Sequence, residues 1–193
     1  MSYAVVILAA GLATRMGRPK QLLPAGGVAM VRRVVEAACR TAADPVVVVT
    51  GAYGAQVARS VAGLCASCVE NTHYETGSYS SLRTGLEAIA ETQCPAVVLV
   101  ADMPAIPTEV IEAVGRSLEQ GSWGVLTDYS DGPGHPFGLS AEMISSLPVT
   151  APDRFIFDML ETDERAERLT YQTSKPLDVN TPEDYEMLGE AEG

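Results

Sequence analysis

The stretch LAAGLATRMGRPK, residues 8–20, decides how this chain folds at its start. It continues the apolar run Ala4–Leu8, and its only charged side chains are Arg15, Arg18 and Lys20. Small residues after a strand let backbone N–H groups near Gly11 approach a ligand closely, and the cations attract an anion. The stretch therefore predicts a phosphate-binding loop at the end of a strand.

The spacing of the glycines excludes two common nucleotide-binding signatures. No Gly-Lys-Ser/Thr follows, so the loop is not a Walker loop, and the second and third glycines of the GxGxxG fingerprint are missing. Taken alone, the loop leaves open a second interpretation, in which it is a glycine-rich turn whose basic residues lie in solvent.

Apolar runs and amphipathic patterns alternate along the chain. Continuous apolar runs at 4–8, 46–49 and 97–100 predict strands of a parallel sheet that is covered on both faces. Helical periodicity predicts helices over 28–41, 79–91 and 108–120, and turn residues predict loops at 51–54, 102–107 and 131–136. We expect a three-layer α/β/α sandwich, built as one domain over residues 1–193.

Charge and hydropathy exclude several classes of partner. The net charge of −12 repels nucleic acid and anionic membranes, and Lys20 is one of only two lysines. No apolar segment reaches the roughly 18 residues of a transmembrane helix, and no leader pattern is visible, so a cytoplasmic protein is expected. Cys65 and Cys68 form a CxxC pair near His73 that lacks a second pair of zinc ligands. Together with Cys39 and Cys94 they are expected to be ordinary thiols.

Three oxygen-bearing side chains follow predicted strands or precede a predicted helix. Asp102 comes directly after the apolar run at 97–100, and Thr108 is the better cap for the next helix, which leaves Asp102 free to hold a metal ion. Asp178 and Asn180, two apart on an extended segment, can offer oxygens to one ion. In the alternative interpretation, Asn180 simply precedes a helix capped by Thr181.

These motifs together resemble a known family. Gly11, Thr14, Arg15, Met16, Gly17 and Lys20 lie in step with the signature of the nucleotidyltransferases that act on the molybdenum cofactor, and the cytidylyltransferase branch looks closest. Further matches lie at Asp102, at Gly134-His135-Pro136 and at residues 178–182. The resemblance implies a Rossmann-like, mostly parallel sheet of about seven strands, with a late antiparallel excursion around residues 134–140.

The resemblance also implies roles for individual residues. Arg15 and Lys20 would be catalytic, Asp102 with Asp178 or Asn180 would hold Mg²⁺, and His135 would line the acceptor side, although a lone histidine is more often a packing residue. The nucleotide would lie against the following residues: Leu8, Ala9, Ala10, Gly11, Thr14, Gly17, and Ser80 or Ser81.

The activity implied is Mg²⁺-dependent transfer of a nucleotide, CMP in preference, from an NTP to the terminal phosphate of molybdopterin cofactor, with release of pyrophosphate. The partners would be CTP, the molybdopterin cofactor and a molybdoenzyme that receives the product. Three alternatives stay open: a sugar-phosphate or polyol-phosphate acceptor, GTP in place of CTP, and a non-catalytic protein that delivers the cofactor.

Overall fold

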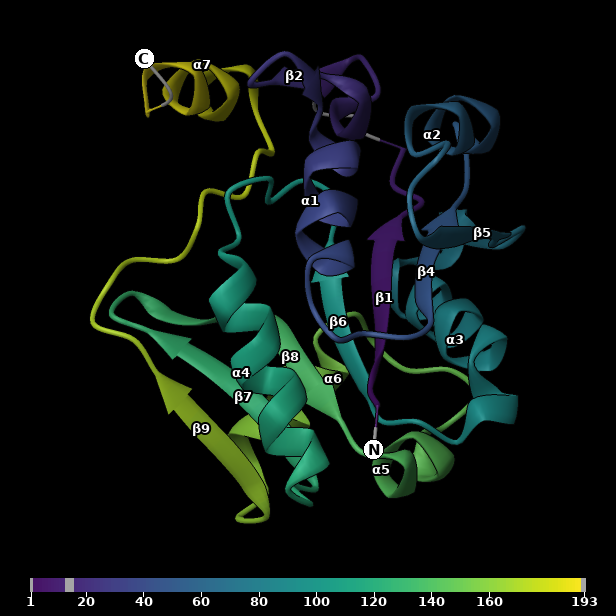
Figure 1. The fold of residues 1–193 in the computed structure, drawn as a ribbon, viewed down its shortest axis with the longest axis vertical. Helices are drawn as coiled ribbons and strands as arrows, with labels where there is room; N and C mark the ends of the chain where they lie inside the picture. Colours follow the sequence, from purple (N-terminus) through teal and green to yellow (C-terminus); the bar gives the residue numbers. More distant parts are fainter. Residues whose placement is uncertain (1, 13–15, 192–193) are drawn as a thin grey trace.

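A computed structural model describes residues 2–12 and 16–191 of the chain, and Figure 1 shows the arrangement of its strands and helices. A seven-stranded sheet forms the centre, with the strand order β5-β4-β1-β6-β8-β7-β9. Its strands are β1 (Ala4–Ala9), β4 (Val46–Thr50), β5 (Ala66–Glu70), β6 (Ala96–Val100), β7 (Gly124–Tyr129), β8 (Gly132–Leu139) and β9 (Ala166–Thr170). β8 is antiparallel to both β6 and β7, and the other pairs are parallel. The predicted fold class is confirmed.

The central strands are apolar throughout because both of their faces are buried. Val5 and Ile7 of β1 pack into the core on one side of the sheet, whereas Ala4 and Val6 pack into the core on the other side. This alternation follows from the two-residue period of a strand. Burial on both faces fixes the register of β1, and with it the place where the first loop begins.

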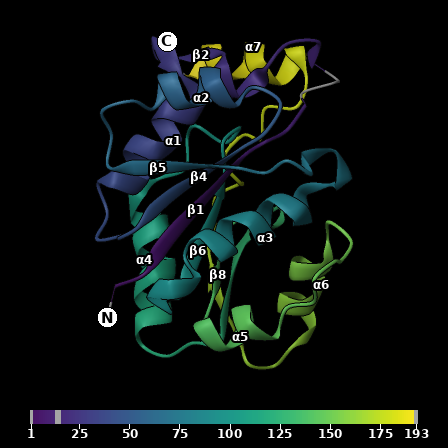
Figure 2. The same ribbon diagram turned by 90° about the vertical axis from the view of Figure 1, so that its right-hand side faces the viewer.

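Helices cover both faces of the sheet, as Figure 2 shows in side view. One face packs against α1 (Met30–Cys39), α2 (Gly54–Ser60) and α4 (Thr108–Glu119). The other packs against α3 (Ser78–Ala88), α5 (Ala141–Ser146) and α6 (Phe155–Thr162). Among the described residues, 3-10 turns at Lys20–Leu22, Tyr74–Thr76 and Ala90–Thr92 connect these layers. The predicted three layers are confirmed, with boundaries that differ from the predicted ones by a few residues.

A third, smaller core joins the two ends of the described chain. The short hairpin of β2 (Pro24–Ala25) and β3 (Val28–Ala29) packs with α7 (Pro182–Ala191), which lies beside it in Figure 1. The buried side chains of this core are Met16, Leu23, Ala25, Met30, Val179 and Leu188. The contact brings the segment before α7 to the edge of the sheet where β1 and β6 end.

The Gly-His-Pro motif lies in strand β8, which corrects the predicted loop at 131–136. Glycine and proline indicate turns, but here they occupy a β-bulge in which Val125 faces Gly138 and Thr127 faces Gly134. The hydroxyl of Thr127 donates to the carbonyl of Pro136 at 2.6 Å. Hydroxyl groups of β7 thus satisfy carbonyls of this bulged stretch, whose proline has no N–H to donate to a neighbouring strand.

Two further expectations are wrong. Thr108 is the first residue of α4 rather than its cap, since Pro107 occupies the cap position and no side-chain capping bond forms there. Cys39, at the end of α1, is joined to Cys65 by a disulfide, whereas Cys68 and Cys94 are free. The fold brings the end of α1 beside the residue before β5, so a pairing between cysteines 26 residues apart could not be seen in their spacing.

Gly85 offers a test of the packing between α3 and the sheet. A Cβ atom at this position would lie 2.4 Å from Val6 Cγ1 and 2.9 Å from Val49 Cγ2. Gly85→Ala is therefore expected to lower the free energy of unfolding by ~1–3 kcal/mol, in spite of the better helix propensity of alanine. Gly189→Ala in α7 is the matched control, because nothing lies within 4 Å of its added Cβ. Chemical denaturation of both variants measures the difference, and equal stabilities would contradict this packing.

None of the helices in the described part of the chain has the length and apolar character needed to cross a bilayer.

Candidate active site at the ends of β1 and β6

Three polar side chains from distant parts of the sequence meet beside the ends of β1 and β6. The Lys20 ammonium lies 2.5 Å from Asp102 Oδ2 and donates a hydrogen bond to Asn180 Oδ1 at 2.8 Å. The side chains of Lys20 and Asp102 are only 15% and 18% exposed. Placing such an ion pair away from water costs free energy because both charges lose their hydration. The pair therefore adds little to the stability of the fold by itself.

Each of the three residues is positioned by the backbone around it. Asp102 follows β6 directly, and Lys20 opens the 3-10 turn after the first loop. The segment of Asn180 is docked onto the end of β6, because the Val179 N–H donates to the Asp102 carbonyl at 3.0 Å and Val179 is fully buried. These contacts hold the segment that carries Asn180 against the sheet at Asp102.

A capping box fixes Asn180 from the other side. Asp184 Oδ2 accepts the N–H groups of Asn180 and Thr181 at 2.9 and 2.8 Å, and the Asp184 N–H donates to Thr181 Oγ1 at 3.2 Å. These bonds hold the pKa of Asp184 below its ordinary value, the bond from Asn180 contributing most. The predicted cap at Thr181 is confirmed, and the metal-binding and capping interpretations of this segment are compatible.

The side-chain oxygens of Asp102, Asp178 and Asn180 suit a divalent cation that takes its remaining ligands from phosphate groups and water. Asp102 Oδ1 is buried and has no hydrogen-bond partner among the described residues, a costly arrangement for a carboxylate oxygen. Burial and the charge of Asp102 together raise the pKa of nearby Asp178. The described chain contains no cluster of three or more His, Cys, Asp or Glu residues suited to a metal. Mg²⁺ needs only one or two protein carboxylates when phosphate oxygens and waters complete its octahedron.

A cavity of about 340 Å³ opens beside this cluster, and its size lies within the range of small-molecule sites. Its floor is the end of β1 and the start of the first loop, and its rim includes the turn before α3. The predicted residues that line it are Leu8, Ala9, Ala10, Gly11, Lys20, Ser81, Asp102 and Asn180. The structure thus brings together most of the predicted nucleotide and metal residues around one opening.

The two candidate serines have different surroundings. Ser81 is buried, lines the cavity and accepts a hydrogen bond from Asn71 Nδ2 at 3.0 Å. Ser80 donates to the carbonyls of Gly77 and His73 and is not among the described residues that line the cavity. Its geometry is that of a residue that closes the turn before α3, so Ser81 is the better placed of the two for a ligand.

Four other predicted residues lie outside this cavity or outside the described chain. Gly17 is exposed, and neither Gly17 nor Asp178 is part of the described lining. Thr14 and Arg15 lie outside the described residues, so their predicted roles stay predictions.

His135 belongs to a smaller neighbouring cavity. Its Nδ1 lies 3.3 Å from the Val98 carbonyl, and its ring packs against those of Phe137 and Phe157. Burial lowers the pKa of His135 to about 4, so the imidazole is neutral at pH 7.

Sequence reasoning missed Gln21 at the floor of the larger cavity. Its side chain is 4% exposed, and Nε2 donates to the carbonyls of Ala9 and Gly11 at 3.4 and 3.3 Å. These bonds tie the start of the first loop to the 3-10 turn that carries Lys20. A polar residue after a lysine gives no pattern that would have identified it. Tyr74, Glu75 and Ser78 also line the cavity, from the 3-10 turn at Tyr74–Thr76 and the first residue of α3.

Comparison with known proteins identifies the family. The model of the MobA-like NTP transferase domain matches residues 5–167, which include β1, the first loop and Asp102. The chain belongs to this family. The family is one of NTP transferases, and the match includes Lys20 and Asp102, whereas Asn180 lies beyond its end.

Relatives of known sequence or structure support this assignment. The chain is 33% identical over 135 residues to the bifunctional protein GlmU of Alcanivorax borkumensis, a match that spans 69% of this chain and 29% of that protein. The chain thus matches less than a third of the length of the curated relatives. A homologue of Mycobacterium tuberculosis Rv0371c from Mycobacterium sp. strain JC1 superposes with a TM-score of 0.83 at 28% identity, covering 97% and 96% of the two chains.

Rv0371c from Mycobacterium tuberculosis H37Rv, solved as a complex with manganese, has the same fold. Its TM-score is 0.81 at 24% identity, over 99% of this chain and 100% of that chain. For the MobA-like domain described here, this similarity shows the fold alone.

Proposed function

We propose that this MobA-like domain transfers a nucleotide, CMP in preference, from an NTP to the terminal phosphate of molybdopterin cofactor and releases pyrophosphate. The observation that carries the proposal is the meeting of Lys20, Asp102 and Asn180 beside a cavity large enough for a nucleotide. The choice of molybdopterin rests on the resemblance of the Gly-His-Pro motif to the cofactor-specific branch.

The nucleotide is held mainly by backbone groups in this proposal. Ala9, Ala10 and Gly11 have no bulky side chains, so a base and the sugar can approach the backbone there closely. The triphosphate then follows the first loop toward Lys20, whose ammonium offsets the charge of the transferred phosphate. Gln21 keeps the floor rigid by its bonds to the first-loop carbonyls.

Asp102, helped by Asn180 and Asp178, would hold the divalent cation. The unpartnered Asp102 Oδ1 and the amide oxygen of Asn180 are ligands that Mg²⁺ accepts. When bound, such a cation neutralises phosphate charge and orients the reacting groups. A protein of the same fold was solved as a complex with manganese, which supports a divalent cation as the cofactor.

The reaction proposed here needs no general base. A phosphate monoester has its second pKa near ~6, so the acceptor is largely deprotonated at neutral pH and its oxygen can attack the α-phosphate directly. The bond to the α-phosphate forms as the bond to pyrophosphate breaks. The protein then has to position two anions and reduce their repulsion, which Lys20 and the residues around Asp102 can do.

The test is release of pyrophosphate by the purified protein with each NTP and purified molybdopterin cofactor. Release that depends on the cofactor supports the proposal. Release with a sugar phosphate or polyol phosphate instead would assign a different acceptor. Binding of the cofactor without any release would indicate a delivery protein.

CTP is expected to be preferred over GTP. A site built from fixed backbone donors and acceptors rejects the wrong base because its own polar groups are left unpaired, at a cost that can reach several kcal/mol. Competition turnover with equal CTP and GTP measures the preference as the ratio of the two products. An excess of the guanine nucleotide product would place the protein in the guanylyltransferase branch, without changing the expected roles of Lys20 and Asp102.

A further inference from the structure

A single ammonium group contacts two of the oxygens that are proposed to hold the divalent cation. Lys20 Nζ lies 2.5 Å from Asp102 Oδ2 and donates a hydrogen bond to Asn180 Oδ1 at 2.8 Å. These oxygens come from two segments of the chain, the residue after β6 and the residues before α7. The ammonium thus joins the two segments in the way that a bound metal ion would join them.

The ammonium satisfies only part of the Asp102 carboxylate. Asp102 Oδ1 is buried and has no hydrogen-bond partner among the described residues, which costs free energy. A divalent cation carries more charge than an ammonium and would compensate this carboxylate better. The side chains of Lys20 and Asp102 are only 15% and 18% exposed, so water screens little of the repulsion between two cations on one carboxylate. Lys20 and a divalent cation are therefore competitors for Asp102.

Lys20 also offsets the repulsion between two neighbouring carboxylates. Burial and the charge of Asp102 raise the pKa of Asp178, whereas the charge of Lys20 acts in the opposite direction. Without a positive charge between them, the segment that carries Asp178 would be repelled from the end of β6. The site therefore needs one cation or another in each of its states.

The adjoining cavity offers the ammonium a second place. Lys20 and Asp102 both line the cavity of about 340 Å³ that is proposed to hold the nucleotide. A lysine side chain has a flexible stem of four carbons, so its ammonium can change partners without a movement of the backbone. A phosphate group in this cavity would give Lys20 a partner in place of Asp102.

We propose that Lys20 competes with the divalent cation for the oxygens of Asp102 and Asn180: it holds them while the site is without nucleotide, and it has to leave them when the cation binds. The inference rests on the proposed function, which assigns the cation to Asp102, and it adds a control on that site. Uptake of the cation is favoured when a phosphate is present to receive Lys20.

Binding of Mn²⁺ to the protein without nucleotide or acceptor tests the competition. The EPR signal of free Mn²⁺ gives the dissociation constant for each variant. Lys20→Met is expected to bind Mn²⁺ at least ~10-fold more tightly than wild type, because the competing charge is removed while an unbranched apolar stem remains. The same substitution that is expected to slow transfer of the nucleotide is thus expected to strengthen binding of the cation.

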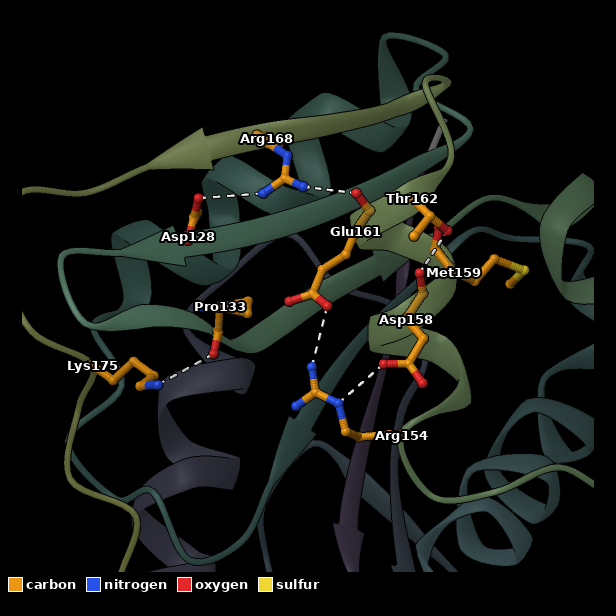
Figure 3. A network of polar contacts seen from close by, with 9 residues as sticks. All are labelled: Asp128, Pro133, Arg154, Asp158, Met159, Glu161, Thr162, Arg168 and Lys175. Carbon is orange, nitrogen blue, oxygen red and sulfur yellow. Dashed lines mark hydrogen bonds and ion pairs between the residues drawn. The ribbon is translucent and has the colours of Figure 1, made fainter.

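Two variants control for this gain. Lys175→Met removes the same charge at the β7–β8 hairpin, where Lys175 Nζ donates to the carbonyls of Asp131 and Pro133, and the contact with Pro133 is drawn in Figure 3. It is expected to bind Mn²⁺ within about twofold of wild type. Asp102→Asn in the Lys20→Met background is expected to lose the gain, because Asp102 provides the charged ligand.

Chemical labelling of the wild-type protein tests whether Lys20 leaves its partners, and it does not depend on the folding of a variant. Lys20 and Lys175 are the only lysines of the sequence, so mass spectrometry after brief treatment with acetic anhydride follows each of them separately. Saturating Mn²⁺ is expected to raise the acetylation rate of Lys20 at least ~3-fold, because the ammonium is released from its ion pair beside an open cavity. The rate at Lys175 is expected to stay the same.

The outcomes separate this inference from the proposed function. Mn²⁺ binding by Lys20→Met that equals or falls below that of wild type, equal tightening in Lys175→Met, or an unchanged acetylation rate of Lys20 would overturn the competition. A gain that survives Asp102→Asn would overturn it as well. Neither readout uses an NTP or an acceptor. If Lys20→Met binds Mn²⁺ more tightly but wild type releases no pyrophosphate from any NTP, the transfer reaction is refuted and the competition stands.

Discussion

Turnover of the Lys20→Ala variant is expected to fall by at least ~100-fold, which corresponds to a loss of ~2.7 kcal/mol of transition-state stabilisation. Lys20 is held by Asp102 and Asn180 at 2.5 and 2.8 Å, so its ammonium is already positioned beside the proposed nucleotide cavity. Removing it leaves the transferred phosphate without this charge. Pyrophosphate release under saturating substrates measures the loss, and thermal unfolding checks that the variant is folded.

The other lysine of the chain provides the control for Lys20. Lys175 Nζ donates to the carbonyls of Asp131 and Pro133 in the β7–β8 hairpin, and Figure 3 shows the contact with Pro133. Lys175→Ala removes the same charge from the protein at a place away from the cavity, and its turnover is expected to stay within about twofold of wild type. Near-normal turnover of Lys20→Ala would remove Lys20 from the mechanism.

Asp102→Asn is expected to raise the Mg²⁺ concentration needed for half-maximal rate at least ~10-fold and to lower the maximal rate. The amide keeps the shape of the side chain but removes the negative charge that a hard divalent cation prefers. The fold is expected to persist, because Lys20 still donates to Asn180 and the Val179 N–H still donates to the backbone carbonyl of residue 102. Titration of the rate with Mg²⁺ measures the shift.

Asp128→Asn controls for the loss of one carboxylate. Asp128 lies on β7, where it pairs with Arg168 at 3.4 Å in the surface network of Figure 3. Its substitution is expected to leave the Mg²⁺ dependence unchanged. If Asp102→Asn shows the same dependence as this control, the metal ligand has to be sought elsewhere, first at Asp178.

The central strands and the longer helices of the early half were predictable because they bury their side chains in simple patterns, whereas β5 and α2 were not predicted. β1, β4 and β6 are covered on both faces, so they appear as continuous apolar runs, and α1 and α4 show clear apolar stripes. The late strands carry no comparable signal. β8 contains glycine, proline and histidine held by side-chain hydrogen bonds, and β9 is an edge strand with exposed residues.

The residues of the candidate site that lie at the end of a strand or at the start of a helix were predictable from local sequence rules. The end of β1, the position of Asp102 after β6 and the capped start of α7 follow from local rules, and these rules place Lys20, Asp102 and Asn180 correctly at strand or helix ends. Gln21 could not be found in this way, since it acts on a segment that only the folded chain brings near. The Cys39–Cys65 pairing is hidden for the same reason.

The wide separation of Lys20 and Asn180 in the sequence has a consequence during synthesis of the protein. The two residues are 160 positions apart, and Asn180 is held by a segment that follows every strand of the sheet. A growing chain can form β1, β4 and β6, and so most of the nucleotide cavity, well before Asn180 leaves the ribosome. Under the proposed function, the site would therefore be completed only when α7 docks beside the β2–β3 hairpin, after the residues of the nucleotide cavity have been synthesised.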